Sequence, residues 1–250
     1  MPVLRSHPPA LTRAATALLV CCALLAACGG GGSSPQPTRL VSLSDNFHRA
    51  DGDIDGQPSP SKQPYLLQHD QGGTGLEISD NRLVRARPAA YGANGSPILI
   101  WPLRTDPVVV TSRFVFEPGR TRFQDVVVGA CQDGFGRSSI QLAVSPTSWK
   151  LLYTLVRAEE GTGTEINVIA QGQLPSMLST DGRTVYEEAI RVDLAASSAT
   201  VSYPGGSQVV SNPVISKYWG KRMGVQIRRP NSTDGDAQVV SITAQLPARH

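Results

Sequence analysis

Apolar and polar residues alternate with a period of two along much of the chain beyond residue 39. Met223, Val225 and Ile227 alternate with small or polar residues, and Val240 and Ile242 belong to a second run of this kind. Successive side chains of a β-strand point to opposite faces of its sheet. The pattern therefore predicts strands that bury one face and expose the other.

The predicted strands are separated by turn dipeptides such as Asp181-Gly182 and Pro204-Gly205. No segment has the period of a long amphipathic helix. So many half-exposed strands predict an all-β fold of two antiparallel sheets packed face to face, and the lack of an internal repeat argues against a propeller. The expected strands lie near Arg39–Ser44, Tyr65–Gln68, Leu76–Ile78, Arg82–Arg87, Ile98–Trp101, Pro107–Glu117, Arg122–Cys131, Ser139–Val144, Lys150–Arg157, Ile166–Gln171, Val185–Leu194, Ala199–Tyr203, Gly224–Arg228 and Ala237–Leu246.

One predicted strand carries a carboxylate on its apolar face. Glu188 shares that face with Tyr186 and Ile190, whereas Glu187 points the other way. Glu188 is therefore a candidate functional group, with a strand-end position or a buried ion pair as the alternatives.

The N-terminus has the features of a secretory signal peptide, expected over residues 1–27. Arg5 and Arg13 precede an uncharged apolar run that ends at Ala27. This run is shorter than the ~20 residues that cross a bilayer. Residues 25–28, Leu-Ala-Ala-Cys, resemble the lipobox of bacterial lipoproteins. The resemblance implies lipid transfer to Cys28, cleavage before it and acylation of the new amine, with palmitate as the expected chain. Gly29 in place of an aspartate favours the outer membrane, and a plain secretory signal is the alternative.

Residues 28–38 are expected to form a lipidated cysteine and a flexible Gly/Ser/Pro tether, followed by one folded domain over 39–250. Without the signal peptide, 21 Lys+Arg stand against 20 Asp+Glu, a net charge of about +1. This balance argues against nucleic acid as a partner. Cys131 has no partner for an intramolecular disulfide, because the other cysteines lie at or before position 28. A buried thiol is expected, with a disulfide-linked dimer or a reactive thiol as alternatives.

Three segments together resemble the concanavalin A-like (laminin-G-like) jelly rolls. They are Asp45-Asn-Phe-His-Arg-Ala-Asp-Gly52, Leu76-Glu-Ile-Ser-Asp-Asn-Arg-Leu83, and Tyr218-Trp-Gly-Lys-Arg-Met-Gly-Val-Gln-Ile-Arg-Arg229 followed by residues 239–244. The resemblance spans roughly residues 40–246 and implies a two-sheet antiparallel sandwich. The family usually has a Trp soon after the first turn, and Tyr65 is expected to replace it here. The family contains lectin-like modules, glycoside hydrolases, polysaccharide lyases and adhesin domains, so the fold does not decide the function.

The sequence lacks the residues that catalysis on this fold would need. Retaining glycosidases of the family carry Glu-x-Asp-x-x-Glu on one strand, which places two carboxylates ~5 Å apart, and that phrase is absent. The histidines after the signal peptide, His48, His69 and His250, have no evident base or metal partner. We therefore expect a protein that is not an enzyme.

Asp51, Asp53 and Asp55 match the first half of a calcium loop. The EF-hand pattern needs a glutamate at its twelfth position, which is Lys62 here, and Pro58 and Pro60 interrupt the loop. A looser structural calcium site is one interpretation of these aspartates, and a solvated turn is the default. No other cofactor is expected.

The remaining candidates are polar and aromatic side chains on the predicted strands. Amide and guanidinium groups suit sugar hydroxyls and uronate carboxylates, and aromatic rings stack on sugar faces. The expected function is a membrane-anchored domain that binds glycan or another envelope ligand, with a polysaccharide hydrolase or lyase, or a structural envelope component, as alternatives. The candidate ligand-binding residues, expected to line one concave sheet, are Arg113, Gln141, Arg191, Gln226 and Arg228, with Trp149, Tyr153 or Trp219 for stacking.

The lipid anchor makes a direct prediction. The Cys28→Ala variant has no thiol to acylate, so it should move from the detergent phase to the aqueous phase or remain as uncleaved precursor in a phase-partition assay. Normal membrane partitioning of the variant would rule out a lipid anchor at this position.

Overall fold

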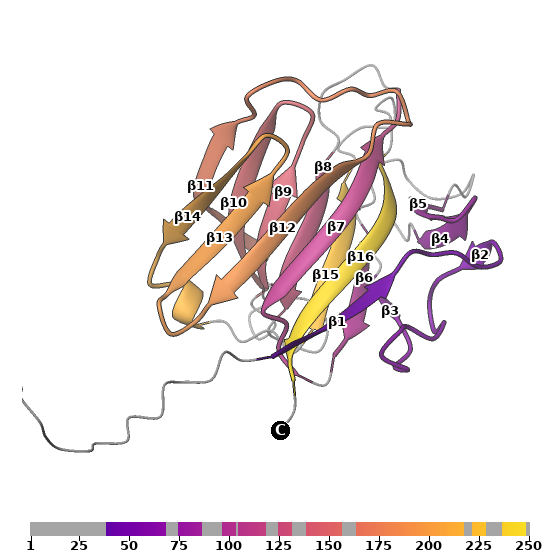
Figure 1. Ribbon diagram of the computed structural model, residues 1–250, viewed down its shortest axis with the longest axis horizontal. Coiled ribbons are helices and arrows are strands. Elements are labelled where there is room, and N and C mark those ends of the chain that lie inside the picture. The colour runs from indigo at the N-terminus through magenta and orange to yellow at the C-terminus, as the bar shows by residue number, and fades with distance from the viewer. Residues whose placement is uncertain are drawn as a thin grey trace, which may run out of the picture. The chain divides into compact units, whose positions relative to one another are not determined.

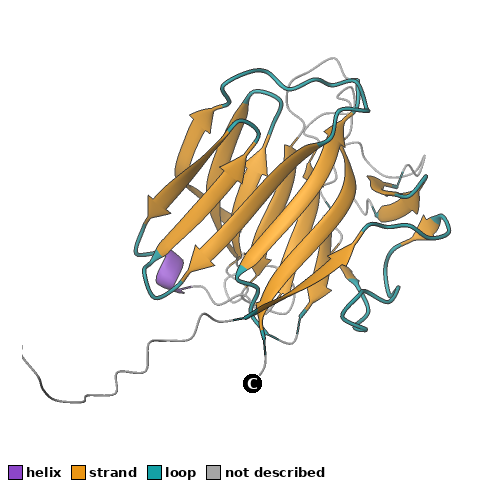
Figure 2. Cartoon of the chain, in the orientation of Figure 1, coloured by secondary structure: helices purple, strands orange, loops and turns teal. Residues whose placement is uncertain are grey.

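The computed structural model describes residues 39–68, 75–86, 97–103, 105–118, 125–131, 139–156, 164–217, 222–228 and 237–248. These residues form strands and one short 3-10 helix (Figures 1 and 2). The elements are β1 (Leu40–Asp45), β2 (Gly52–Asp53), β3 (Leu66–Gln68), β4 (Leu76–Ser79), β5 (Arg82–Arg85), β6 (Ile98–Pro102), β7 (Val109–Phe116), β8 (Asp125–Cys131), β9 (Ser139–Val144), β10 (Ser148–Val156), β11 (Thr164–Gln173), β12 (Tyr186–Asp193), β13 (Ser198–Tyr203), β14 (Gly206–Ser211), η1 (Ile215–Lys217), β15 (Arg222–Arg228) and β16 (Ala237–Pro247).

The strands form two antiparallel sheets. The nine-stranded sheet has the order β14-β13-β12-β7-β16-β5-β4-β2, with β1 paired to β16. The seven-stranded sheet has the order β11-β10-β9-β8-β15-β6-β3. Figure 1 shows the first sheet in front of the second. The predicted all-β jelly-roll sandwich is therefore confirmed. In the described part of the chain, no helix has the length and apolar character needed to span a membrane.

The apolar faces predicted by alternation form the layer between the sheets. Met223, Val225 and Ile227 are buried there, each at most 1% exposed. The prediction for Val240 was wrong, because it is half-buried and Val239 is buried in its place. The register between β16 and β7 shifts between Val239 and Ser241. A bulge inserts one extra residue into a strand, so it reverses which residues face inward.

Strand β14 was missed by the sequence pattern. It is the edge strand of the nine-stranded sheet and buries only Val210, while Val209 is 65% exposed. An edge strand with one buried residue has no visible alternation. Its turn was predicted correctly: Pro204-Gly205 joins β13 to β14, and Gly205 has the positive φ (85°) that a Pro-Gly turn requires.

The sequence motif that begins at Asp45 holds the chain together where β1 ends. Asp45 is 4% exposed, and its carboxylate accepts hydrogen bonds from the backbone N–H of Phe47 (2.7 Å) and the hydroxyl of Tyr65 (2.7 Å). The Arg49 guanidinium donates to both oxygens of the same carboxylate, at 3.0 Å. Phe47 is fully buried at a positive φ of 57°, a conformation that costs free energy for a side chain of this size. The hydrogen bonds of the buried Asp45 carboxylate therefore offset the free-energy cost of the strained turn at Phe47.

Tyr65 occupies the interior beside this motif. Its side chain is fully buried, and its ring packs edge-on against Trp101 with the ring centroids 6.0 Å apart. An aromatic core residue is thus present where the family usually has a tryptophan. Burial, and then the neighbouring Asp45 carboxylate, raise the pKa of Tyr65 far above that of a free tyrosine.

Replacing Tyr65 by phenylalanine tests this contact. The variant loses one hydrogen bond to a buried carboxylate, so the free energy of unfolding should fall by about 1–2 kcal/mol at neutral pH. Because the pKa of Tyr65 is raised in the folded protein, its contribution to stability is present below about pH 10 and is lost as the pH rises further. Urea unfolding should therefore give a steeper alkaline loss of stability for the wild type than for Tyr65→Phe. The two proteins differ only in this hydroxyl group, so parallel curves would contradict the assignment.

Candidate functional site

The candidate ligand-binding residues do not share one face of the molecule. Arg113 and Arg191 lie on β7 and β12 of the nine-stranded sheet, whereas Gln141, Gln226 and Arg228 lie on β9 and β15 of the seven-stranded sheet. The expectation that all of them line a single sheet is therefore wrong. Alternation identifies the exposed side of each strand, but it does not show which sheet the strand joins.

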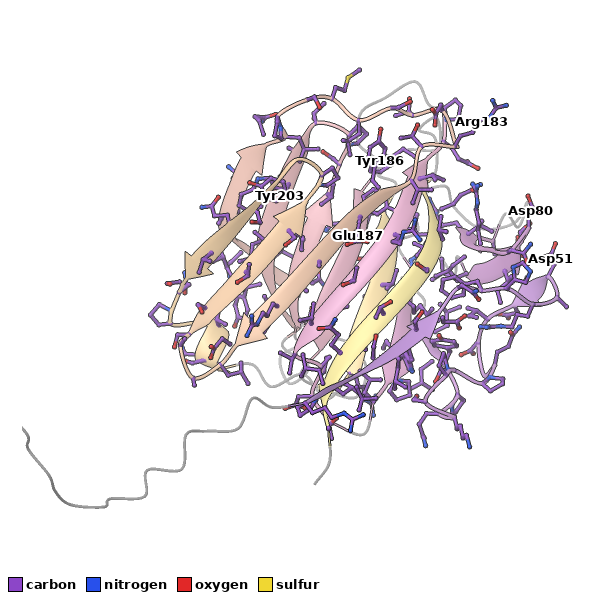
Figure 3. All side chains as sticks on the ribbon, viewed as in Figure 1. Asp51, Asp80, Arg183, Tyr186, Glu187 and Tyr203 are labelled. Atoms are coloured by element: carbon purple, nitrogen blue, oxygen red, sulfur yellow. The ribbon has the colours of Figure 1, made fainter. Side chains whose placement is uncertain are left out.

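The arginines of the nine-stranded sheet point away from the core. Arg113 is exposed and lies across from Glu187 of β12, and Arg191 is also exposed. Figure 3 shows Glu187 on the outer side of β12. Opposite charges on neighbouring strands form an ordinary exposed sheet surface.

Trp149 is a core residue and cannot stack on a ligand. It is 2% exposed, and its ring stacks on that of Tyr203 with the centroids 4.9 Å apart and the planes at 11°. Each aromatic residue lies across from a glycine of an edge strand, Trp149 from Gly172 and Tyr203 from Gly206. A Cβ atom on either glycine would come within 2.8 Å of the aromatic side chain. Figure 3 shows Tyr203 on β13. The stack therefore joins the two sheets near their β14 and β11 edges.

Tyr153 is half-buried and packs against the same core. Trp219, the third stacking candidate, lies outside the described residues, as do Cys28, His69 and His250. Cys131 lies in β8 across from Ser139 and Arg222, but its side chain is outside the description. The buried thiol therefore stays a prediction.

The three aspartates of the candidate calcium site accept hydrogen bonds from backbone N–H groups. Asp53 accepts a hydrogen bond from the backbone N–H of Asp55 (3.0 Å), and Asp55 accepts one from that of Leu67 (2.9 Å). Asp51 accepts one from the backbone N–H of Asp80 (3.1 Å), and Figure 3 shows these two residues side by side. Among the described residues, no three His, Cys, Asp or Glu side chains gather in a way that could hold a metal ion. The three carboxylates thus act on three separate backbone groups.

Glu188 faces the layer between the sheets, as its position in the alternation predicted. Its side chain is fully buried, and it lies across from the equally buried Ser112 of β7. A ligand in solution has no access to a carboxylate in this position. This placement argues against contact with a ligand, and the buried ion pair stays a prediction.

Two glycines lie side by side in a row of paired residues that crosses the centre of the seven-stranded sheet. Gly129 of β8 lies across from Gly224 of β15, with Gln141 of β9 and Ile100 of β6 at the two ends. The neighbours of Gly224 along its strand face the core, so the row belongs to the outward face of the sheet. We call these four residues the glycine row. Gln141 is 8% exposed and donates its amide N–H to Ser139 Oγ at 2.7 Å.

Polar side chains lie on both sides of the glycine row. Arg222 and Gln226 are two residues to either side of Gly224 on β15, and both are half-buried. Lys150 of β10 is exposed and belongs to the same transverse row of the sheet as Gln226. The sequence pattern did not identify Arg222, because the strand predicted from it begins at Gly224. Arg222 nevertheless points to the same face of the strand as Gln226 and Arg228. Gly224, Gln141 and Ile100 of the row are buried, whereas these amide, guanidinium and ammonium donors are at least partly exposed and suit hydroxyl and carboxylate acceptors.

The described outward face of the seven-stranded sheet presents no carboxylate pair. Its described polar side chains are amides, hydroxyls and cations. Acid–base catalysis of glycoside cleavage needs two carboxyl groups on either side of the bond. The described residues of this face therefore include no carboxylate pair of that kind.

Comparison with known proteins identifies the fold. No protein-family model and no curated protein sequence matches the chain. The carbohydrate-binding module CBM66 from Bacillus subtilis is similar to it with a TM-score of 0.51 and 8% identity, over 71% of this chain and 94% of the module. The carbohydrate recognition domain of Emp46p in its potassium-bound form has a TM-score of 0.55 and 11% identity, over 84% of this chain and 97% of that domain. At such low identity these likenesses show the fold alone, a jelly-roll sandwich consistent with a concanavalin A-like domain.

Gly172→Ala should destabilise the protein by about 1–3 kcal/mol, because the added methyl group meets the Trp149 ring, which is buried and stacked on Tyr203. Urea unfolding measures the change. Gln171→Ala, at an exposed neighbouring position, is the matched control and should shift stability by no more than about 0.5 kcal/mol. Equal free energies of unfolding for the two variants would show that the Trp149 ring can move away from the added methyl group.

Proposed function

We propose that this protein is a lipid-anchored envelope protein whose sandwich domain binds glycan without cleaving it. The observation that carries the proposal is the set of partly or fully exposed donors Lys150, Gln226 and Arg222 on one sheet face, which has no described carboxylate. The similarity of the fold to a carbohydrate-binding module and a carbohydrate recognition domain supports it.

The bound glycan would lie on the outward face of the seven-stranded sheet. The amide, guanidinium and ammonium groups of Gln226, Arg222 and Lys150 would donate hydrogen bonds to its oxygens. A site built on strands holds its donors in fixed positions. Affinity for a single chain is expected to be weak, since water solvates sugars well, and many anchored copies would add avidity.

The anchor in this proposal is Cys28, lipidated after cleavage of residues 1–27 and followed by the tether of residues 28–38. The Gly29 position favours the outer membrane as its location. A flexible tether allows the domain to reach polymer chains at some distance from the bilayer.

Glycan binding can be tested with the detergent-solubilised full-length protein on a polysaccharide array. Gln226→Ala should weaken retention by about fivefold, the equivalent of one lost hydrogen bond. Arg113→Ala is the control, because it removes an exposed strand residue from the other sheet, and it should leave retention unchanged. Arg113→Ala should keep the wild-type melting temperature, since exposed strand positions shift stability by only about 0.5 kcal/mol. The melting temperature of Gln226→Ala, a change at a half-buried position, is measured alongside, so that a loss of stability is not taken for a loss of binding.

The other outcomes of this experiment decide between the alternatives. Release of reducing sugar or of unsaturated uronate would show a hydrolase or a lyase. Retention of no polysaccharide at any concentration would favour a structural envelope component. A loss of binding with Arg113→Ala alone would move the site to the nine-stranded sheet.

A further inference from the structure

The strands at the ends of the two sheets differ in length, charge and regularity. β2 has two residues and β3 has three. β11 carries Glu165 and has a bulge at Ile169, and β1, beside β16, ends at the charged Asp45. Short length, bulges and charges are features that keep an edge strand from pairing with another chain. Each of these four strands has at least one of them.

β14 has none of these features. Its six residues, Gly-Ser-Gln-Val-Val-Ser, include no charge and no proline. Its register with β13 runs without a bulge, and within the described part of the chain it pairs with β13 alone. Every residue of β14 except Val210 is exposed, and Figure 1 shows β14 as the outermost strand of the front sheet. β14 is therefore an open sheet edge.

The turn before β14 determines which of its backbone groups face outward. The two residues that flank Pro204-Gly205 lie across from each other, so they form the hydrogen-bonded pair that closes the turn. Hydrogen-bonded and non-hydrogen-bonded pairs then alternate along an antiparallel ladder. The N–H and C=O groups of Ser207, Val209 and Ser211 therefore point away from β13. The side chain of Val209, in the middle of this set, is 65% exposed.

We propose that β14 pairs antiparallel with β14 of a second copy of this chain, with Val209 on the twofold axis. In this register Val209 lies across from Val209 of the other copy, and Ser207 lies across from Ser211. These residues point to the same face of the strand, so the two nine-stranded sheets join into one continuous sheet. Their outward backbone groups exchange the hydrogen bonds of an antiparallel ladder. The inference does not rest on the proposed glycan-binding function.

The lack of charge near this edge suits a second copy of the same chain. Neither β13 nor β14 contains a charged residue, so self-pairing brings no like charges together. On β12, the next strand, Arg191 lies across from Thr200, which in turn lies across from Val209. Five strand spacings would separate Arg191 of the two copies, roughly 24 Å at ~4.8 Å per strand. This distance exceeds the Debye length of ~8 Å at physiological salt, so the repulsion between them is screened.

The pairing is small, and we expect a dimer that forms only at high protein concentration. A stable interface uses about 20–30 residues of each partner, whereas β14 has six. If many copies are anchored to one membrane, as proposed above, their effective concentration rises without any new contact.

Disulfide cross-linking tests the register. The Cα atoms of a hydrogen-bonded antiparallel pair are ~5.5 Å apart, which a disulfide can bridge. Oxidation of full-length Val209→Cys in neutral-detergent solution should therefore give a covalent dimer on a non-reducing gel. Ser207→Cys and Ser211→Cys should cross-link when mixed, and neither should cross-link alone. Val168→Cys, at an exposed position of β11, is the matched control, and the wild type controls for the native cysteines. Both should remain monomeric on the gel.

A charge at the axis tests the contact without any covalent bond. Val209→Lys places two ammonium groups beside each other and removes the apolar contact, so the dimer dissociation constant should rise at least about tenfold. Sedimentation equilibrium over a range of protein concentrations measures it. Val168→Lys, the same change at the edge of the other sheet, should leave the constant unchanged. Both positions are exposed, so both variants should keep the wild-type melting temperature.

The opposite results would overturn the proposal. A wild type that remains monomeric at every concentration rules out the dimer, whatever other strand β14 can accept. Equal cross-linking of Val209→Cys and Val168→Cys shows collision without a preferred edge. A loss of association with Val168→Lys, and none with Val209→Lys, assigns the interface to β11 instead.

Discussion

The apolar layer between the two sheets is the constraint on which the other features of this molecule depend. Val110 and Phe114 of one sheet and Met223 and Val225 of the other are all almost completely buried in it. Burial of apolar surface is worth roughly 25 cal/mol per Å² and has no preferred direction. It therefore determines which face of every strand points inward and leaves the outward faces free to differ in chemistry. Among the described side chains, the outward face of the nine-stranded sheet carries both charges, and that of the seven-stranded sheet carries cations and amides.

Hydrogen bonds and an aromatic stack add contacts of fixed geometry to this non-directional apolar burial. At the end of β1, the buried Asp45 carboxylate gathers N–H and O–H donors from three other residues. Near the opposite edges, Trp149 and Tyr203 stack across the layer, each lying over a glycine. A buried carboxylate without its donors, or an aromatic ring without its space, would cost several kcal/mol. The motif that begins at Asp45 is thus a structural device, and it has no part in the proposed site.

The proposed site follows from the position of β15 next to β8. Gly224 and Gly129 meet there, and the residues on either side of Gly224 then become the donors of a shared surface. The similarity to carbohydrate-binding folds shows only that such a sandwich is compatible with this use. A fold places side chains, and the side chains determine which molecules bind.

Local sequence was sufficient to predict what depends on neighbouring residues. The pleat of a strand has a period of two, so the inward positions of β7, β12 and β15 and the buried Glu188 followed from the alternation. The Pro204-Gly205 turn followed from the conformations that these two residues prefer. Tertiary structure alone decided what depends on distant residues. Strand pairing joins segments that are far apart along the chain, and it placed Arg113 and Gln226 on different sheets and brought Gly129 beside Gly224. It also set Trp149 against Tyr203 and shifted the inward face of β16 at a bulge. No local period encodes such pairings, because their free energy comes from packing between strands and not from any one strand.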